Sequence, residues 1–345
     1  MENRLNTNRA RRDQLTTLKA HTDAVGLKWA AVQRFLPDWA PDACQHRAGL
    51  IELEGFVARH FGFKLLQGGG FEKQPLPQAL FKLKSDTSKE QVSNARQFAT
   101  SVARMAAQGC TKPWNGDTLH HKDIRRLALS NADGRGWVDF EALVETMWQI
   151  GIPVVYLPNL PGKTKKPDGM ATFVEGRPVV VLMKQHDHPD WMLFILAHEI
   201  GHIAKDHVGT DDGAAVVDEE IRPGIDAEDA QEAEANAYAS HVLVPSGQPL
   251  RLNRWPKAEQ LAQEAITYGT QHGISPGHAI LNAVRHTPTA GQNLYPLAMK
   301  ALNVLKEQMH LPSTPQICRD AMNRHLDFDA LKSDTIDFLE KLKVL

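Results

Sequence analysis

The chain has 345 residues, of which 42% are hydrophobic and 23% are charged, and its formal net charge at pH 7 is −2. This composition predicts a globular protein with a substantial core, and the balanced charge gives no electrostatic case for nucleic-acid or membrane binding by the chain as a whole. The three cysteines are widely separated, no apolar leader follows the basic N-terminus, and no apolar run approaches the ~20 residues that span a bilayer. We therefore expect a cytoplasmic protein that does not interact with membranes.

Residues 1–85 are predicted to form a helical N-terminal region. Apolar residues recur at helical spacing over 29–36 and over 50–61, and Pro37 and Pro41 separate the two segments. Two short helices joined by a turn also outline a DNA-reading helix-turn-helix, here a degenerate one. A packing subdomain is the favoured interpretation, because no side-chain pattern singles out a recognition helix.

Residues 86–288 are predicted to form a second domain that contains both helices and a small sheet. Helical periodicity or capping signals mark segments at 89–108, 140–149, 189–206 and 233–243. Strand-like runs occur at 151–157, 170–174 and 179–182, the last two as a hairpin, and an acidic, irregular stretch covers 211–232. With a helical C-terminal region at 289–345, the fold class is predicted to be α+β and mostly helical.

One motif carries recognisable chemistry, the HExxH sequence His198-Glu199-Ile200-Gly201-His202. Residues four apart lie on one face of a helix, so both imidazoles can bind one zinc ion, while Glu199 can act as the general base. The motif lies in a strongly apolar segment, where burying two histidines and a glutamate is costly unless a metal satisfies them. The sequence therefore predicts a catalytic site with one Zn²⁺ per chain.

A third zinc ligand must come from further along the chain, because Lys205 and Val208 stand where a metzincin would need Gly and His. Glu234 is the leading candidate in the acidic stretch, because it opens an apolar helix, and a helix is a rigid platform for a ligand. Glu232 is the nearest rival. The two lie about 200° apart on a helix, so they cannot both face the metal.

Three segments together resemble the ImmA/IrrE family of metallopeptidases. The first is the strand Gly176–Leu182 with its GRP sequence, the second is the segment Leu196–His202, and the third is Glu232–Ala239 with its ExEAN pattern, which leads to Leu243-Val244-Pro245. The resemblance covers about residues 140–285. The sequence departs mildly from the family pattern at Tyr238, where Phe is usual, and at Val244, where Met is common.

The resemblance implies a gluzincin-like metallopeptidase core with Glu234 as the third metal ligand. It also implies a substrate, because members of the family cleave helix-turn-helix transcriptional repressors that are often encoded beside them. The family response follows DNA damage, stress or phage infection, and the chain is similar in size to CapP-like peptidases of anti-phage systems. A site-specific zinc endopeptidase that cleaves a nearby repressor is thus the leading functional hypothesis.

Further residues are candidates for roles at this site. His207, after the motif helix, is a candidate for polarising the scissile carbonyl, and His241 or Tyr238 for donating to an oxyanion. The strand residues Val179, Val180 and Val181 are candidates for holding an extended substrate at a sheet edge. Each has an ordinary alternative, a surface histidine or a packed side chain.

Cys110 is a candidate for an inhibitory thiolate in the open zinc position, although a buried inert cysteine is the more common situation. The basic N-terminus and the loop with Lys163, Lys165 and Lys166 could bind phosphates, so a nucleic-acid activator is a possible partner. The alternative to a peptidase is a DNA-binding regulator that carries an inactive peptidase-like domain. It would keep the zinc fold without needing the base Glu199.

Overall fold

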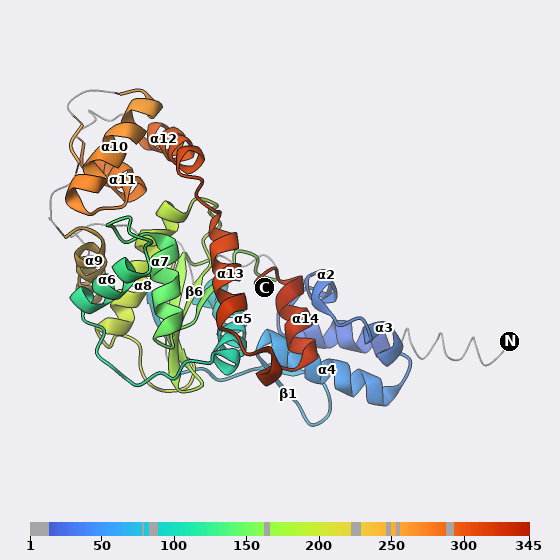
Figure 1. Ribbon diagram of the computed structural model, residues 1–345. Helices are drawn as coiled ribbons and strands as arrows, with labels where there is room; N and C mark the ends of the chain where they lie inside the picture. Colours follow the sequence, from blue (N-terminus) through green and yellow to red (C-terminus); the bar gives the residue numbers. More distant parts are fainter. Residues whose placement is uncertain are drawn as a thin grey trace.

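The computed structural model describes residues 14–77, 79–82, 89–161, 166–221, 229–245, 250–252, 256–287 and 293–345. Within these residues the protein is mostly helical, with a two-stranded and a five-stranded sheet, which confirms the α+β fold class (Figure 1). The basic residues Arg9, Arg11, Arg12, Lys163 and Lys165, candidates for phosphate contacts, lie outside the described residues.

The N-terminal region contains short helices and a small antiparallel sheet. After a helical segment at 14–24, its elements are α2 (Trp29–Val32), the 3₁₀ turn η1 (Gln33–Phe35), α3 (Ala40–Ala43), α4 (Arg47–Phe61), β1 (Phe63–Leu65) and β2 (Phe71–Lys73). The long helix α4 ends at Gly62, whose φ of 77° is the left-handed conformation that glycine adopts at helix C-termini.

The five-stranded sheet has the strand order β3-β7-β5-β6-β4. Its strands are β3 (Leu80–Lys82), β4 (Val154–Tyr156), β5 (Gly169–Val174), β6 (Arg177–Leu182) and β7 (Ala214–Asp218). The central strand β5 pairs antiparallel with both β7 and β6, whereas the outer strands β3 and β4 pair in parallel with β7 and β6. Strand β7 was not predicted, because it lies inside the stretch that acidic residues had marked as irregular.

The predicted hairpin is present as β5 and β6, joined by Glu175 and Gly176, which both have positive φ. Two such residues form the tight turn that matches the twist of a hairpin. The predicted edge position of Val179, Val180 and Val181 is wrong, because β4 pairs with β6 and makes it an internal strand. A strand with neighbours on both sides has no free backbone groups to bind an extended substrate.

Helices α5 (Lys89–Gly109) and α8 (Pro189–Ala204) pack against β5 and β6. Nearly every residue of both strands is buried, so both faces of this part of the sheet are covered. The main core extends from here to α6 (His121–Ser130), α7 (Phe140–Gln149) and α9 (Ala230–Leu243). Helix α8 is thus surrounded by sheet and helices, which makes its polar side chains unusual.

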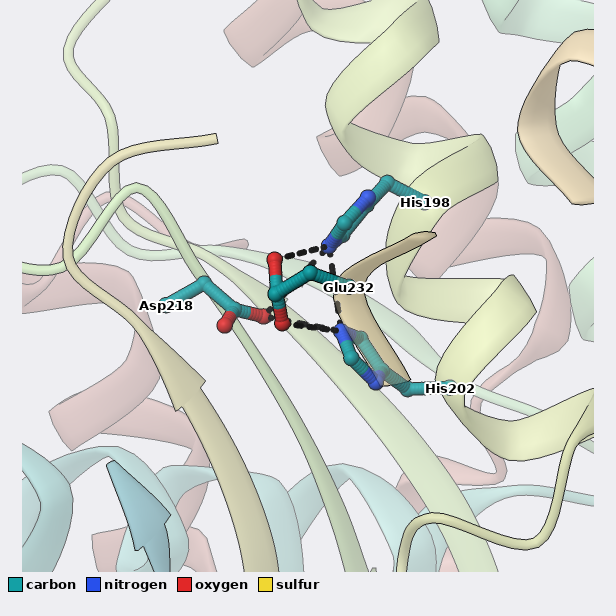
Figure 2. A group of neighbouring side chains, drawn as sticks. All are labelled: His198, His202, Asp218 and Glu232. Atoms are coloured by element: carbon teal, nitrogen blue, oxygen red, sulfur yellow. Dashed lines mark hydrogen bonds and ion pairs between the residues drawn. The ribbon is translucent and has the colours of Figure 1, made fainter. Parts of the chain in front are cut away.

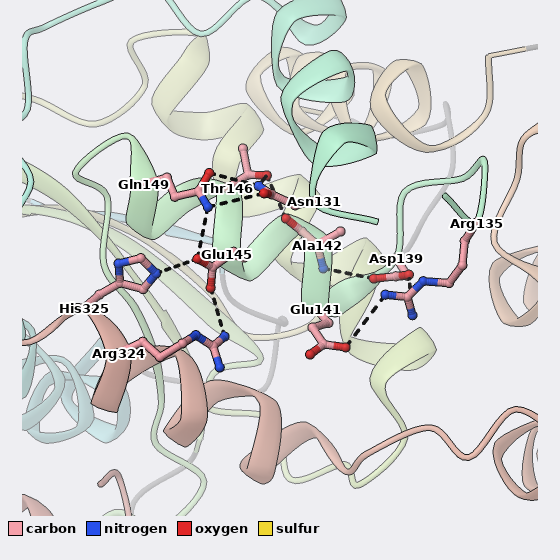
Figure 3. Close-up of polar contacts among 10 residues, drawn as sticks. All are labelled: Asn131, Arg135, Asp139, Glu141, Ala142, Glu145, Thr146, Gln149, Arg324 and His325. Carbon is pink, nitrogen blue, oxygen red and sulfur yellow. Dashed lines mark hydrogen bonds and ion pairs between the residues drawn. The ribbon is translucent and has the colours of Figure 1, made fainter. Parts of the chain in front are cut away.

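Helix α13 (Thr314–His325) is attached to α7 by a polar network around Glu145 (Figure 3). Glu145 accepts from Arg324 at 2.9 Å and lies 2.7 Å from Nε2 of His325. On the same helix, the side chain of Asp139 caps the N-terminus by accepting from the backbone N–H of Ala142 at 2.9 Å. These contacts join the C-terminal segment to the helix that packs on α8.

A second hydrophobic cluster lies in α10 (Ala258–His272), α11 (Pro276–His286) and α12 (Tyr295–Gln308). The last elements, η2 (Phe328–Ala330) and α14 (Ser333–Lys341), return to the main core, where Phe338 contacts the rings of Phe35, Phe56, Phe61 and Phe98. Figure 1 shows α14 beside the N-terminal helices. The main core contains residues from both sides of the predicted domain boundary after residue 85, and the second cluster contains residues from both sides of the predicted boundary after residue 288. The division into these three domains stays a prediction.

None of the helices in the described part of the chain combines the length and the apolar character needed to cross a membrane.

Candidate metal centre

The motif segment lies on α8, as its periodicity predicted. Pro189 occupies the first turn, and the preceding His188 accepts a hydrogen bond from the backbone N–H of Asp190, so proline and a capping side chain start the helix. His198, Glu199 and His202 are all 0% exposed. Burying three polar side chains in an apolar helix requires partners that satisfy them.

Four side chains from three elements converge on one point (Figure 2). They are His198 and His202 of α8, Asp218 at the end of β7, and Glu232 in the first turn of α9. Each offers one nitrogen or oxygen, and these atoms all lie within 4.8 Å of one another. The Nε2 atoms of the two histidines are only 3.0 Å apart.

Hydrogen bonds to the far sides of the rings indicate where the protons of the two histidines lie. Nδ1 of His198 is 3.0 Å from Oδ1 of Asn236, an acceptor, so Nδ1 carries the proton and Nε2 of the neutral ring carries a lone pair. The carboxylate of Glu234 accepts from Nε2 of His207 at 2.9 Å, which leaves Nδ1 of His207 to accept from Nδ1 of His202 at 2.9 Å. Nε2 of His202 therefore also carries a lone pair.

The lone pairs of the two imidazole nitrogens therefore face the carboxylate oxygens of Glu232 and Asp218 at the centre of the cluster. Carboxylate oxygens of Glu232 lie 3.5 Å from Nε2 of His198 and 3.4 Å from Nε2 of His202, and Oδ2 of Asp218 lies 3.3 Å from the latter. Neither oxygen of Asp218 has a hydrogen-bond donor among the described residues. Two imidazoles and two carboxylates that converge on one point are suited to bind a divalent cation, and this donor set fits zinc.

The pKa values of His202 and Glu232 also indicate that the cluster favours a positive charge at its centre. Burial disfavours charged His202, but its contacts with Asp218 and Glu232 outweigh burial and raise the pKa of His202 to about 9. Burial opposes the ionised form of Glu232 too, but the adjacent His198 and His202 favour it and lower the pKa of Glu232 well below its usual value. A bound cation would take the place of the proton that these shifts draw into the cluster.

The structure differs from the sequence prediction at the third ligand. Helix α9 starts at Ala230, earlier than predicted, so Glu232 and Asn236 lie one turn apart on the face toward α8. Glu232 therefore points at the two histidines, as Asn236 does. Glu234 lies on another face, with its side chain 56% exposed, and contacts His207 instead of the centre of the cluster.

Asp218 is one of several acidic residues that the stretch at 211–232 offered as ligands, and sequence reasoning did not single it out. It is 1% exposed, and its backbone carbonyl accepts from the N–H of Asp168 at 2.8 Å, which fixes the end of β7 beside the start of β5. The short continuous apolar run Ala214-Ala215-Val216-Val217 is the signal of a buried strand, but the surrounding acidic residues obscured it.

Glu199 lies next to the four donors, between α8 and β5. A Cβ at Gly169 would overlap its carboxylate, so glycine at this point of the strand leaves room for the side chain in its present position. Burial, followed by the charges of Asp218 and Glu232, raises the pKa of Glu199 well above its usual value. Among the described residues its oxygens have no well-formed hydrogen bond, although the backbone of Ala171 interacts weakly with the carboxylate.

The glycine inside the motif also has a structural role. A Cβ at Gly201 would lie 2.9 Å from the backbone Cα and O of Ala235, closer than real Cβ atoms approach. Helices α8 and α9 therefore pack backbone to backbone at this point. This close approach allows Glu232 and Asn236 of α9 to reach the histidines of α8.

Three other predicted site residues are not placed at the cluster as expected. Both ring nitrogens of His207 are used in contacts with His202 and Glu234, so His207 is placed to orient a ligand and not to polarise a carbonyl. His241 is exposed and packs against His121 of α6, with ring centroids 4.9 Å apart. Tyr238 is buried against the same histidine, with ring centroids 6.4 Å apart.

The position of Cys110 favours the buried, inert cysteine that was the preferred interpretation over the inhibitory thiolate. Its Sγ contacts the carbonyl of Lys112 and lies near Arg177, at the turn end of the β5–β6 hairpin, whereas Glu199 contacts Gly169 at the other end. Six residues of strand separate these ends, roughly 17–20 Å at ~3.3 Å per residue. Burial also raises the pKa of the Cys110 thiol, which disfavours a thiolate.

Comparison with protein families gives a match at the same part of the chain. Residues 148–265 match the model of peptidase family M78, described as the IrrE N-terminal-like domain. This segment begins in α7, ends in α10 and includes all four clustered side chains. No curated protein and no solved structure matches the chain. Residues 148–265 are therefore an IrrE N-terminal-like peptidase domain, which confirms the resemblance to the ImmA/IrrE family.

Proposed function

We propose that the protein is a site-specific zinc endopeptidase that cleaves a helix-turn-helix transcriptional repressor. The observation that carries the enzymatic part is the convergence of two imidazole lone pairs and two carboxylates beside a buried glutamate. Zinc would be held by His198, His202 and Glu232, with Asp218 as a further carboxylate at the same centre. When bound there, zinc supplies a Lewis acid that polarises a carbonyl and lowers the pKa of water to ~7.

The chain's own residues would then divide the remaining work. Glu199 accepts the proton of the attacking water on its carboxylate and later donates it to the leaving amine. Burial and the neighbouring carboxylates raise the pKa of Glu199, and the positive charge of a bound cation would offset both effects, so that this carboxylate could ionise. Asn236 and the pair His207 and Glu234 hold the two imidazoles in the tautomer that binds metal.

The choice of substrate rests on the family and not on the cluster. Members of the ImmA/IrrE family cleave helix-turn-helix repressors in DNA-damage, stress or phage-defence responses, so a repressor encoded beside this protein is the proposed substrate. A nucleic acid is a possible activator. A buried site favours restricted cleavage, because few segments of a folded protein can reach it.

The test is a cleavage assay with the zinc-loaded protein and the helix-turn-helix protein encoded next to it. Wild type is compared with Glu199→Gln by intact mass, and zinc content is measured for both. We expect one cut by wild type alone, while both proteins bind zinc. The absence of a cut by either protein, with DNA or oxidant added as activators, would contradict the assignment. It would then favour a DNA-binding regulator with an inactive peptidase-like domain.

A further inference from the structure

The four side chains of the candidate metal centre are arranged as a closed set of ligands (Figure 2). The Nε2 atoms of the two histidines are 3.0 Å apart, and the carboxylate oxygens of Asp218 and Glu232 lie 3.3–3.8 Å from them. Four donors at the corners of a tetrahedron around one zinc ion are about 3.3–3.5 Å apart, because each bond is ~2.0–2.2 Å long. The four side chains can therefore bind one ion together.

A closed set of ligands is at variance with catalysis. Catalytic zinc sites have three protein ligands and keep the fourth position for water, whereas structural sites have four protein ligands. The candidate base is buried as well, because Glu199, His198 and His202 are 0% exposed and Asp218 is 1% exposed. The proposed peptidase reaction therefore requires one ligand to leave. The two histidines cannot leave without distortion of α8, so the ligand that leaves is a carboxylate.

Of the two carboxylates, that of Glu232 is the more firmly placed. Its two oxygens lie 3.5 Å from Nε2 of His198 and 3.4 Å from Nε2 of His202, so it faces both rings. It belongs to α9, which packs backbone to backbone on α8 at Gly201, and a helix is a rigid platform for a ligand. Asp218 instead is the last residue of β7 and approaches the rings with Oδ2 alone. Its carboxylate can therefore leave with the smaller rearrangement.

Asp218 also lies on the same side of the sheet as the candidate base. It is the cross-strand partner of Gly169 in the antiparallel pair of β5 and β7. Side chains directly opposite each other in such a pair point to the same face of the sheet. A Cβ at Gly169 would point into the carboxylate of Glu199, so Asp218 extends toward the same part of α8. The carboxylate of Asp218 thus takes up space next to the base, where the reaction needs water.

Three contacts of Asp168 hold the end of β7 in place. Its backbone N–H donates to the carbonyl of Asp218 at 2.8 Å, and its Oδ2 accepts from the N–H of Ile221 at 3.2 Å and from Nζ of Lys184 at 2.6 Å. The two valines that precede Asp218 are fully buried, and their burial opposes displacement of β7 as a whole. The part that can move is therefore the segment 218–221.

We propose that Asp218 is an inhibitory ligand of the peptidase, and that the enzyme is latent until the segment 218–221 moves away from the metal centre. This inhibition depends on the proposed peptidase function. With Asp218 in place, all four ligands of the centre come from the protein. Its departure leaves room for water beside Glu199, while the two histidines and Glu232 keep the metal.

Acetohydroxamic acid tests for the freed position, because it binds zinc only where the protein ligands leave room. Its dissociation constant is measured by calorimetry on zinc-loaded wild type and on Asp218→Ala, and the zinc content of both is determined. We expect Asp218→Ala to retain zinc and to bind the acid about 10–1,000-fold more tightly than wild type, since minor open states are typically populated to ~0.1–10%. Asp218→Asn preserves the shape of the side chain and should change the binding in the same direction.

A second pair of variants tests the segment that moves. Asp168→Ala leaves Asp218 in the chain but removes the carboxylate that holds the segment 218–221, so binding of the acid should tighten by about 2–10-fold, as loss of one hydrogen bond implies. Asp212→Ala is the matched control, because this aspartate precedes the other end of β7, where it pairs with Arg104 at 2.6 Å. The control should bind the acid as wild type does.

Equal binding of acetohydroxamic acid by wild type and Asp218→Ala, with zinc in both, would overturn the inhibitory role and leave the peptidase proposal standing. Loss of zinc from Asp218→Ala would overturn it too, because Asp218 would then be a permanent ligand. Failure of the wild type to bind zinc would instead contradict the metal centre, and both proposals with it. Equal binding by Asp168→Ala and Asp212→Ala would overturn the assigned movement of the segment.

Discussion

Gly169 of β5 and Glu199 of α8 are in such close contact that a side chain at residue 169 would require the glutamate carboxylate to move. The backbone of the sheet therefore acts as one wall of the site and restricts where the candidate base can lie.

Gly169→Ala should displace the Glu199 carboxylate. We expect a loss of stability of about 1–3 kcal/mol from overpacking and a loss of activity of about 100-fold, because a shift of this kind misplaces a catalytic group. Zinc content should stay close to one per chain. Urea denaturation, metal analysis and the cleavage assay measure the three effects. Gly68→Ala, where a Cβ meets nothing within 4 Å, serves as the control, and equal effects of both variants would contradict this role.

The two glutamates at the start of α9 should differ in their effect on zinc. Glu232→Gln removes a carboxylate that faces both histidines, whereas Glu234→Gln only weakens the contact that orients His207. Loss of an outer partner typically costs ~10–100-fold in metal affinity, and Glu232→Gln should exceed this range. Competition with a zinc chelator measures both constants. A larger loss of zinc affinity for Glu234→Gln than for Glu232→Gln would instead support Glu234 as the third metal ligand, as the family resemblance implied.

His60 should make the protein sensitive to mild acid. It is buried between α4 and α14, with Nδ1 2.9 Å from the carbonyl of Phe56, and burial lowers the pKa of His60 from 6.5 to about 4. Between pH 6.5 and about pH 4, the imidazole of His60 is therefore protonated in the unfolded chain but neutral in the folded chain. The stability that this residue contributes is present above pH 6.5 and is lost as the pH falls through this window.

The expected loss from His60 is about 2 kcal/mol between pH 7.5 and pH 5. Urea denaturation at the two pH values, for wild type and for His60→Gln, isolates this contribution as a difference. The variant should lose less stability on acidification, whereas the exposed substitution His272→Gln should behave as wild type. An identical pH dependence for His60→Gln and wild type would contradict the assignment.

Cys110→Ser should leave the enzyme unchanged. The thiol lies at the far end of the hairpin from Glu199, so it cannot reach the metal centre without unfolding β6. Cleavage rate and zinc affinity should both stay within about twofold of wild type, since the change removes no group from the site. An increase in activity of the variant would show that the thiol does inhibit the enzyme, through a conformation other than this one.

The sequence predicts the elements of this protein well where local periodicity determines them. Helices α5, α7 and α8 and the β5–β6 hairpin were predicted with nearly correct bounds, because their apolar spacing and turn residues are unambiguous. The neighbours of β6 could not be predicted, because β4 pairs with it across more than twenty residues of intervening chain. Local patterns do not contain such a long-range pairing.

The candidate site was predicted only in part for the same reason. His198, Glu199 and His202 share one helical turn and a fixed spacing, so the motif alone brings them together. The third candidate ligand depends on the first residue of α9, and an error of three residues there changes which glutamate faces the two histidines. Asp218 reaches the cluster through the sheet, and no spacing along the chain indicates it.

The contacts of Phe338 with the N-terminal aromatic residues affect the order in which the chain can fold. Phe98 leaves the ribosome about 240 residues before its partner, a delay of some tens of seconds at roughly 5–20 residues per second. During that time the aromatic faces of Phe35, Phe56 and Phe61 lack the ring that covers them in the native state. The N-terminal helices therefore complete their packing only late in synthesis, when the segment that carries Phe338 has emerged.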